Sequence, residues 1–596
     1  MNKYIQYLSE IQLLLGDGSR KLPLIVSFFL LSSLIDLAGI SLIVPYVALI
    51  VDPDGFIQGD LYKYLTYFRL PVDTNQMLIS ISFGLLGVFV FKAGVAIFIN
   101  KIILSFSYKQ GVKLSSHLMR SYQNLPYEEY LRRNSSEYVF LIQALAGQFS
   151  SILQSLLRLT SEVIVGSAII ILLAWTNGPA LALLAIILGG GMYFYDHFFR
   201  RNIQKYGVLS NQYSTRMIQG IHEGIEGLKE IRILGHQEYF HSFVKENAKK
   251  AAEVRVKSSV ISMAPRYLLE MLLIIFIVSL VLASFIFNYK VDLLLPTLSM
   301  FGIASIRLLP SATQIIAGIT HVRFSRNAIN LLYKDLKYID KVAQDTPIKS
   351  IIQTQEEFNN LTLKNLDFSY ENSNRLALNN ISLKICAGES IGLIGASGSG
   401  KTTLVDMILG LLKHQDNELF YNNRPLNKYL SKWHSQVAYL PQQVFLIDAS
   451  LKCNVALGLG EKSIDMDKLD DALRKAQLSE LVSELPHGVD TMLGERGVRI
   501  SGGQRQRVAL ARAFYHGRSV LIMDEATSAL DTETESEIVN EIERLKGDIT
   551  MIVIAHRLTT VQHCDRIYRL EKGVIVEEGN FQKVAQSSKQ SVEVDT

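Results

Sequence analysis

Long apolar segments fill the first 320 residues of the chain and then stop. A helix needs about 20 apolar residues to cross a bilayer, and six segments are long enough. They lie at about residues 22–51, 77–107, 139–176, 178–199, 260–288 and 292–320. The pattern therefore predicts a transmembrane domain of six helices within residues 1–335.

After a linker at residues 336–355, the pattern changes to short β-rich runs that alternate with helical ones. Such alternation is typical of an α/β domain, which we place at residues 356–590. The predicted fold class is thus multi-domain, with a six-helix transmembrane domain followed by an α/β domain.

Basic residues gather in the two long connections between spans two and three and between spans four and five. Loops rich in Lys and Arg remain in the cytoplasm. Both connections, both termini and the α/β domain are therefore expected on the cytoplasmic side of the plasma (inner) membrane. The helical pattern of the connections predicts that spans two to five continue into the cytoplasm. They should turn near residues 124–134 and 221–235, where a cytoplasmic partner would touch them.

Two shorter stretches have amphipathic helical spacing. Near the N-terminus, Tyr4, Leu8, Ile11 and Leu15 recur at helical spacing before Gly16, which predicts a helix lying on the membrane surface; a frayed terminus is the alternative. In the first outer loop, residues 61–68 predict a similar short helix, or a merely structured loop.

Composition excludes several classes of protein. Apolar residues make up 48% of the chain and the net charge is only +4, so no polybasic surface indicates a nucleic-acid partner. The three cysteines, Cys386, Cys453 and Cys564, are far apart in the sequence. This spacing indicates neither a metal cluster nor a disulfide framework.

The α/β domain contains a phosphate-binding loop (P-loop). The stretch "GASGSGKTT" (395–403) follows the apolar run "SIGLIG" and precedes a helical run, which is the context that such a loop requires. Gly395, Gly398 and Gly400 allow backbone N–H groups to close around phosphate oxygens. Lys401 should reach the β and γ phosphates, and Thr402 should ligate Mg²⁺.

A second motif, "SVLIMDE" (519–525), is a buried strand that ends in two acids. Asp524 suits the Mg²⁺ shell, and Glu525 suits a base that orients or deprotonates the attacking water. Taken alone, the two acids could equally be solvated carboxylates at a strand end.

A third motif, "RISGGQRQRVALARA" (499–513), places Ser501, Gly502 and Gly503 before a helix. This is another helix N-terminus suited to phosphate. One triphosphate does not need two such cradles in one chain. The pattern therefore predicts a homodimer in which each copy's third motif closes on the ATP of the other.

Together with "YLPQQ", "LIMDEATSALD" and "IAHRLTT", these motifs resemble those of ABC ATPases, and the whole chain resembles an ABC exporter half-transporter. The resemblance implies ATP and Mg²⁺ as cofactors, catalytic roles for Glu525, His556 and Gln442, and a place for Asp531 at the dimer seam. It implies Mg²⁺ contacts from Thr402, Gln442 and Asp524. It implies nucleotide contacts from Tyr370, Gly395, Ser397, Gly398, Gly400, Lys401, Thr402, Thr403, Ser501, Gly502, Gly503 and Gln504.

Ionisable residues inside the spans are costly and usually functional. Arg158 and Glu162 are four residues apart, as are Arg266 and Glu270, so structural pairs within a helix are one interpretation. Lys92 and Arg307 have no acid within one turn, and with Arg266 they would suit an anionic substrate group. The stretches "APRYLLE" and "RLLPSATQII" resemble PglK-type flippases of lipid-linked oligosaccharides, which implies a substrate cavity containing Lys92, Arg266 and Arg307.

The expected protein is a homodimeric, ATP-driven ABC transporter that flips or exports a lipid-linked oligosaccharide or a similar anionic amphiphile. An exporter of peptide, drug or free lipid is the first alternative. An ATP-gated or regulatory ABC membrane protein is the second.

Overall fold

The computed structural model describes residues 2–51, 74–176, 178–286, 291–345, 356–370, 373, 375–415, 417–524, 543–544, 546–555 and 558–585. Some side chains within the described helices, including those of Asp36 and Arg307, are also outside this description. The helix predicted at residues 61–68 lies outside the described residues.

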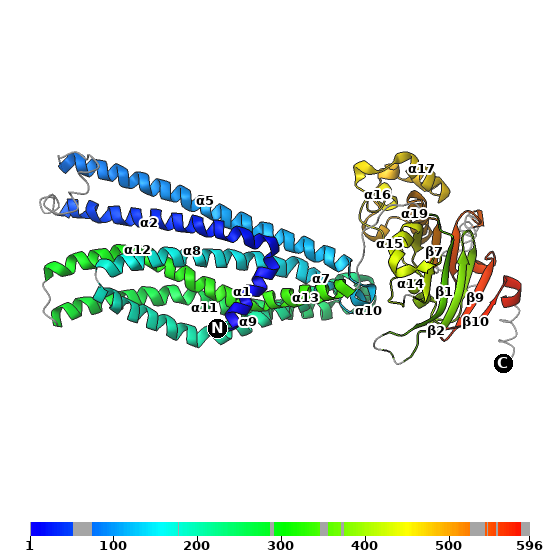
Figure 1. Cartoon of the computed structure of the whole chain (residues 1–596), viewed down its shortest axis with the longest axis horizontal. Helices are drawn as coiled ribbons and strands as arrows, with labels where there is room; N and C mark the ends of the chain where they lie inside the picture. The colour runs from blue at the N-terminus through cyan, green and yellow to red at the C-terminus, as the bar shows by residue number, and fades with distance from the viewer. Residues whose placement is uncertain are drawn as a thin grey trace. The chain divides into compact units, whose positions relative to one another are not determined.

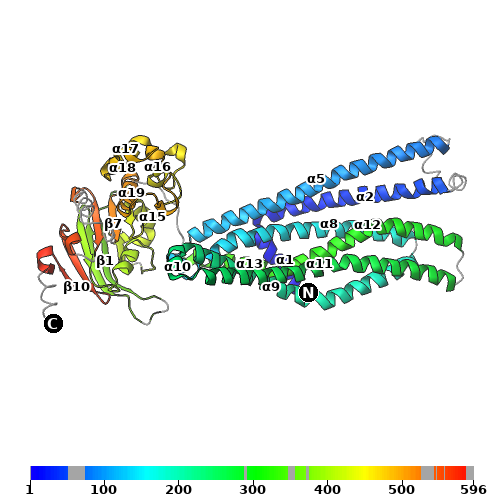
Figure 2. The same ribbon diagram turned by 180° about the vertical axis from the view of Figure 1, so that it is seen from behind.

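The chain divides into two compact units. The first comprises Met1–Leu125 and Tyr130–Asp345, and the second comprises Pro126–Glu129 and Thr346–Thr596. Figures 1 and 2 show the first unit as a bundle of long helices and the second as an α/β unit. The predicted fold class is confirmed.

The main helices of the first unit are α1 (Asn2–Leu15), α2 (Leu22–Val51), α5 (Thr74–Gln123), α6 (Tyr127–Leu131), α7 (Ser135–Val139), α8 (Ala146–Thr176), α9 (Gly178–Glu226), α10 (Leu228–Leu234), α11 (Gln237–Ile286), α12 (Val291–Phe324) and α13 (Arg326–Asp345), of which α6 is shared with the second unit. A 3₁₀ segment, η1 (Gly16–Lys21), follows α1, and a π-helical segment, η2 (Phe140–Leu145), precedes α8. Three helices, α5, α9 and α11, are 49 or 50 residues long. These lengths agree with the prediction that the spans continue past the membrane.

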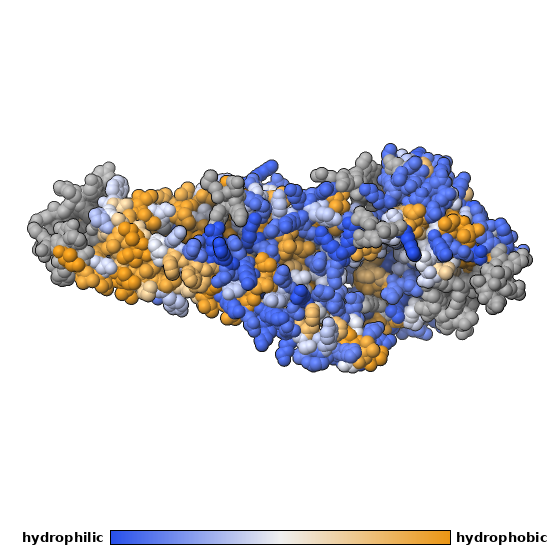
Figure 3. Space-filling model, turned by 90° about the horizontal axis from the view of Figure 1, so that it is seen from below, coloured by the Kyte–Doolittle hydropathy of each residue, from blue (hydrophilic) through white to orange (hydrophobic). Residues whose placement is uncertain are grey.

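Five stretches in the described part of the chain are long and apolar enough to cross a membrane, within Ile5–Ile35, Gln76–Gln123, Ser135–Trp175, Gly178–Glu226 and Gln237–Leu282. The sixth predicted span coincides with α12, where many side chains are not described. In Figure 3 apolar side chains cover one end of the helical unit and polar ones the other. Phe83 and Ile97 on α5 and Ile186 on α9 are each more than 70% exposed, as side chains facing lipid would be.

The N-terminal helix packs differently from the prediction. Tyr7, Ile11, Leu14 and Leu15 of α1 are buried in a core shared with α5, α8 and α13, whereas Leu8 is 60% exposed. The face that packs is therefore centred on Tyr7 and Ile11 and leaves Leu8 exposed; the side chain of Tyr4 lies outside the description. The protein itself, not only a membrane surface, holds this helix.

The second unit contains two sheets. The larger has strand order β10-β9-β3-β8-β7-β6 and the smaller β2-β1-β4-β5. The strands are β1 (Asn360–Phe368), β2 (Leu378–Cys386), β3 (Ser390–Ile394), β4 (Leu419–Tyr421), β5 (Arg424–Pro425), β6 (Val437–Leu440), β7 (Val520–Asp524), β8 (Thr550–Ile554), β9 (Arg566–Glu571) and β10 (Val574–Gly579). The helices are α14 (Lys401–Ile408), α15 (Leu426–Gln436), α16 (Leu451–Val455), α17 (Met466–Lys475), α18 (Ser479–Glu484) and α19 (Gly502–Tyr515).

Two cores stabilise this unit. Residues of β1, β2 and β3 pack with α14 and α15 in one, and α16, α17 and α19 pack on β7 and β8 in the other. Burying an aliphatic side chain contributes about 1.5–3 kcal/mol, and Leu404, Val405 and Met407 of α14 are completely buried. The start of α14 is therefore firmly fixed next to the sheet.

Candidate functional site

The predicted nucleotide residues follow parallel strands that end at one edge of the larger sheet. Strands β3, β8, β7 and β6 are parallel neighbours. β3 ends at Ile394 and leads into the P-loop, β7 ends at Asp524, and β6 ends at Leu440, two residues before Gln442. In open α/β sheets, ligands bind at the carboxyl ends of the strands. The topology thus brings three separate motifs to one edge.

Two glycines let the backbone of the P-loop turn. Gly398 and Gly400 have φ angles of +77° and +104°, which favour glycine. A Cβ at Gly400 would lie 2.9 Å from the carbonyl oxygen of Ala377, so a side chain there would also clash. The loop leads directly into α14, whose N-terminal N–H groups favour an anion.

Lys401 places a cation inside the loop. Its side chain is buried, and its Nζ donates to the carbonyl oxygens of Gly395 at 2.8 Å and Ala396 at 3.0 Å. An ammonium group held this way is available to phosphate oxygens by a short movement. Ser397 is exposed at the tip of the loop.

The oxygen donors at this edge suit Mg²⁺. Asp524 is half-buried and accepts a hydrogen bond from the Tyr439 hydroxyl at 3.2 Å. Burial and the charge of Asp524 raise the pKa of Asp406 to about 6. Asp524 and Asp406 interact through their charges, and Thr402 lies one helical turn before Asp406 on α14. These side chains offer hard oxygen donors of the kind that Mg²⁺ prefers.

Sequence reasoning missed Asp406 and Tyr439. Both lie in otherwise apolar runs, "LVDMILGLL" and "VAYLP", and read there as core positions. A lone acid in the apolar helix after a P-loop was the available signal for Asp406.

Tyr370 lies beside the P-loop helix. Its hydroxyl is 3.3 Å from Oγ1 of Thr403, and its ring packs edge-on against Phe368 at 5.0 Å. The side chain is 40% exposed, which leaves ring surface free to stack on a base. Its role in holding adenine stays a prediction.

The third motif caps a different helix. The Ser501 side chain accepts from the Gln504 amide at 3.2 Å, and Gln504 Oε1 accepts from the Ser501 amide at 2.8 Å. This capping box satisfies two donors, and Gly502 and Gly503 are among the first residues, whose amides a helix leaves without intrahelical partners. Within the described residues, no hydrogen bond joins Ser501 or Gln504 to residues 395–403.

Glu525, Asp531 and His556 lie outside the described residues. Glu525 directly follows β7, and His556 comes two residues after the end of β8. Their catalytic roles, and that of Gln442, stay predictions.

The helical unit contains a cavity of about 460 Å³. It is lined by Ser32, Lys92, Ala96, Ile99, Asn100, Ile103, Arg158, Ser161, Glu162, Val165 and Gln314, from α2, α5, α8 and α12. Lys92 lies 5.2 Å from the centre of the Phe89 ring, and Glu162 accepts from the Ser311 hydroxyl at 2.6 Å. In the described part of the unit no ion pair joins Arg158 to Glu162, although the spacing suggested one.

The three predicted cavity cations have different surroundings. Lys92 lines the cavity with Arg158, which the sequence did not single out as a substrate contact. Arg266 lies on α11 and donates from Nε to Glu270 at 3.1 Å, with 67% of its side chain exposed. This contact is the intrahelical pair of the structural interpretation. Arg307 belongs to α12, but its side chain is not described.

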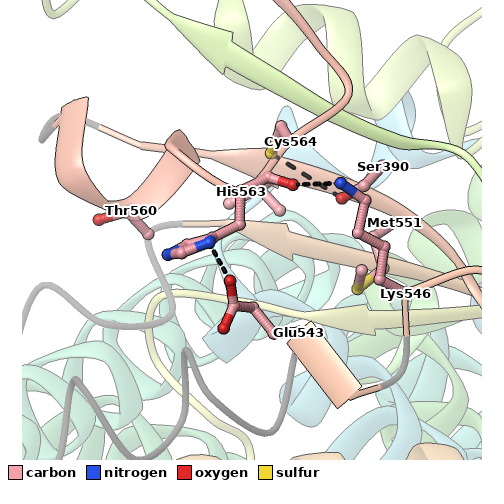
Figure 4. Close-up of a pocket in the computed structure, with 8 residues that line it drawn as sticks. Ser390, Glu543, Lys546, Met551, Thr560, His563 and Cys564 are labelled. Carbon is pink, nitrogen blue, oxygen red and sulfur yellow. Dashed lines mark hydrogen bonds and ion pairs between the residues drawn. The ribbon is translucent and has the colours of Figure 1, made fainter. Parts of the chain in front are cut away.

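A much smaller pocket lies near the opposite edge of the larger sheet (Figure 4). Its volume of about 20 Å³ suits roughly one water molecule. His563 pairs with Glu543 there, and the Ser390 hydroxyl donates to Cys564 Sγ at 3.9 Å. Burial raises the pKa of the Cys564 thiol to about 11. A protonated, buried thiol is a poor nucleophile, so the pocket is structural.

Comparison with known proteins gives three kinds of match. A family described as ABC transporter matches residues 378–528. An ATP-dependent lipid A-core flippase of Cupriavidus metallidurans is 40% identical over 222 residues, which cover 37% of each chain. One of Saccharophagus degradans is 29% identical over 474 residues and 78% of each chain. The chain therefore spans between about a third and four fifths of the length of these relatives.

A solved structure of a bacterial Atm1-family ABC exporter with ATP bound shares the fold. It has a TM-score of 0.74 at 18% identity, over 95% of this chain and 97% of the other. At that identity the likeness supports the architecture alone. The motif order, the parallel-strand edge where the motifs meet and these matches agree: residues 378–528 carry an ABC transporter domain, and the chain has the fold of an ABC exporter half-transporter.

Proposed function

We propose that two copies of this chain form an ATP-driven transporter. The observation that carries the proposal is the presence of two phosphate cradles on separate helices, α14 and α19, with no hydrogen bond between them among the described residues. A homodimer gives both cradles a use, because the N-terminus of α19 in one copy can close on the nucleotide held by α14 in the other.

Residues at the carboxyl ends of the parallel strands would carry out the hydrolysis of ATP. Lys401 and the start of α14 hold the β and γ phosphates, and His556 contacts the γ-phosphate. Glu525 takes a proton from the attacking water while Gln442 orients it. A bond forms from the water oxygen to the γ-phosphorus, and the bond to the oxygen bridging the β and γ phosphates breaks. Thr402, Asp524 and Gln442 would hold Mg²⁺, which supplies charge neutralisation for this step.

The proposed cargo is a lipid-linked oligosaccharide or a similar anionic amphiphile, moved from the inner to the outer leaflet. The cavity supports this cargo because Lys92 and Arg158 supply positive charge, while Asn100, Ser161 and Gln314 supply groups that bind hydroxyls. The names of the flippase relatives, which refer to lipid A-core, also favour an anionic glycolipid. Arg266 and Arg307 remain proposed contacts of the same substrate. ATP-dependent closure of the dimer would switch the spans between inward-open and outward-open states.

The test uses the Glu525→Gln variant, which should bind ATP and close the dimer but not hydrolyse. Lipids that copurify with it are identified by mass spectrometry, and the candidate is then tested in proteoliposomes. Lys92→Ala, or Arg266→Ala with Arg307→Ala, should lower transport at least tenfold while basal ATPase changes less than about twofold. Lys101→Ala, an exposed lysine on α5, is the control.

Three outcomes would contradict parts of this proposal. Normal turnover by Glu525→Gln would show that another group is the base. Unchanged transport by the cavity variants would favour the interpretation that these residues only form structural pairs. ATP hydrolysis with no lipid movement under any condition would favour an ATP-gated or regulatory protein.

A further inference from the structure

The chain passes between the two units at the 124–134 turn and at the end of α13. The four residues Pro126–Glu129 belong to the second unit, whereas Leu125 and Tyr130 on either side belong to the first. Within the second unit, the Glu128 carboxylate accepts from the Lys413 amide at 2.9 Å. The other passage follows Asp345, the last residue of α13.

The chain crosses between the units at two points, and one buried carboxylate joins the parts of the first unit that lie next to them. Asp335, in the middle of α13, has 8% of its side chain exposed. Its Oδ2 accepts from the hydroxyl of Tyr122, at the end of α5, and its Oδ1 accepts from the guanidinium of Arg133, just before α7. The three residues come from α5, the 124–134 turn and α13, and Asp335 is more than 200 positions from each of its donors.

Aromatic rings surround this ion pair. The Arg133 guanidinium lies 5.4 Å from the centre of the Tyr338 ring and 5.9 Å from that of Tyr138. Tyr138 meets Tyr122 edge-on at 4.7 Å and stacks with Tyr130 at 5.8 Å. These contacts shield the charges from water, which strengthens the electrostatic interaction. We name the six residues Tyr122, Tyr130, Arg133, Tyr138, Asp335 and Tyr338 the Asp335 cluster.

The backbone around the cluster is also held. The Asn134 side chain caps α7 by accepting from the Ser136 amide at 2.9 Å. The π-helical segment η2 follows α7 directly, and Ser115 of α5 donates to the carbonyl oxygen of Ile142 within it at 3.0 Å. Single π-helical turns often occur at functional positions. Contacts of the residues just before the turn and of those at its end thus fix the turn to α5 and α13.

We propose that the Asp335 cluster makes the 124–134 turn and α13 move as one body during the ATP cycle. A buried charge that loses one partner is strongly destabilised, so the turn and α13 separate only at high cost. Movement imposed on Pro126–Glu129 is then passed to α13. Asp335, Arg133 and Tyr122 are positioning residues; they take no part in hydrolysis. The proposal rests on the proposed ATP-driven cycle but not on the cargo.

The test is hydrogen exchange of the full-length protein in lipid nanodiscs, with and without MgATP plus vanadate. In the wild-type protein, peptides covering the 124–134 turn and α13 should change protection together. In Asp335→Asn the turn should respond as before, while the response of α13 falls about fivefold, the low end of a typical coupling effect. Asp340→Asn, at an exposed position of α13, should behave like the wild type.

Tyr122→Phe keeps the buried ion pair and the ring, so it carries the test if Asp335→Asn does not fold. We expect it to reduce the α13 response about twofold with unchanged basal ATPase. The proposal would be overturned if the change in protection of α13 were as large in the variants as in the wild type. It would also be overturned if, in the wild-type protein, protection changed in the turn but not in α13. No cargo is needed, so a wrong substrate assignment leaves this test unaffected.

Discussion

At the scale of the residue, environment decides which of several similar side chains is reactive. Cys386 is exposed on β2, whereas Cys564 is buried beside Ser390. Burial raises the pKa of the Cys564 thiol to about 11. The neutral thiol therefore predominates throughout the physiological range.

This difference predicts the order of alkylation. Iodoacetamide applied to the folded protein at pH 8 should label Cys386 well before Cys564, as measured by peptide mass spectrometry. The rate at Cys564 should rise about tenfold for each pH unit between 7 and 9, because its thiolate fraction rises by that factor below the pKa. Fast labelling of Cys564 at pH 7 would show that this site opens readily.

Functional residues that belong to one contiguous motif could be predicted from the sequence. Those that come together only in the folded chain could not. Lys401, Asp524 and Ser501 belong to contiguous motifs, so local order alone identified them. The pKa of Asp406 is raised by its burial and by the charge of Asp524, which is 118 positions away in the chain. Asp335 stood at the boundary predicted between the transmembrane domain and the linker, and its local sequence gave no signal because its partners Tyr122 and Arg133 are distant in the chain.

At the scale of the element, α13 is a common support for the first unit. Arg326, at its start, donates to the Glu10 carboxylate of α1 at 2.5 and 3.1 Å and lies 4.5 Å from the centre of the Tyr7 ring. The Glu10 side chain is 2% exposed. The N-terminal helix is therefore held by an ion pair with a buried carboxylate as well as by its apolar face.

Breaking this pair should loosen α1. Glu10→Gln removes the charge opposite Arg326, and since Arg326 is partly exposed we expect a loss of about 1.5 kcal/mol, the lower end for hydrogen bonds to charged groups. The readout is a lower melting temperature of the detergent-purified protein. The control is Asp17→Asn, whose 3.6 Å pair with Arg20 is almost fully exposed and should contribute little. Equal melting temperatures of Glu10→Gln and the wild type would contradict the supporting role of α13.

The lengths of the spans were easier to predict than the faces they bury. Apolar runs of 20 or more residues specify a helix whatever it packs against, so the long helices were expected. Of the residues predicted on the apolar face of α1, Ile11 and Leu15 are buried and Leu8 is exposed, because helical spacing alone does not say whether lipid or protein covers a face. The partner faces on α5 and α13 became known only with the fold.

At the scale of the whole molecule, the account depends on a second copy of the chain. In the described part of one chain, the N-terminus of α19 makes no hydrogen bond to the P-loop. The Atm1-family structure shares the fold of this chain, and the closing of two chains around nucleotide is the part we propose.

The most direct measurement is the mass of the purified Glu525→Gln variant in detergent, by light scattering, with and without MgATP. The account predicts a protein mass of twice 66.9 kDa with MgATP, and the loss of ATP retention when Ser501 is replaced by Arg. A particle of 66.9 kDa that nevertheless retains bound MgATP would contradict it.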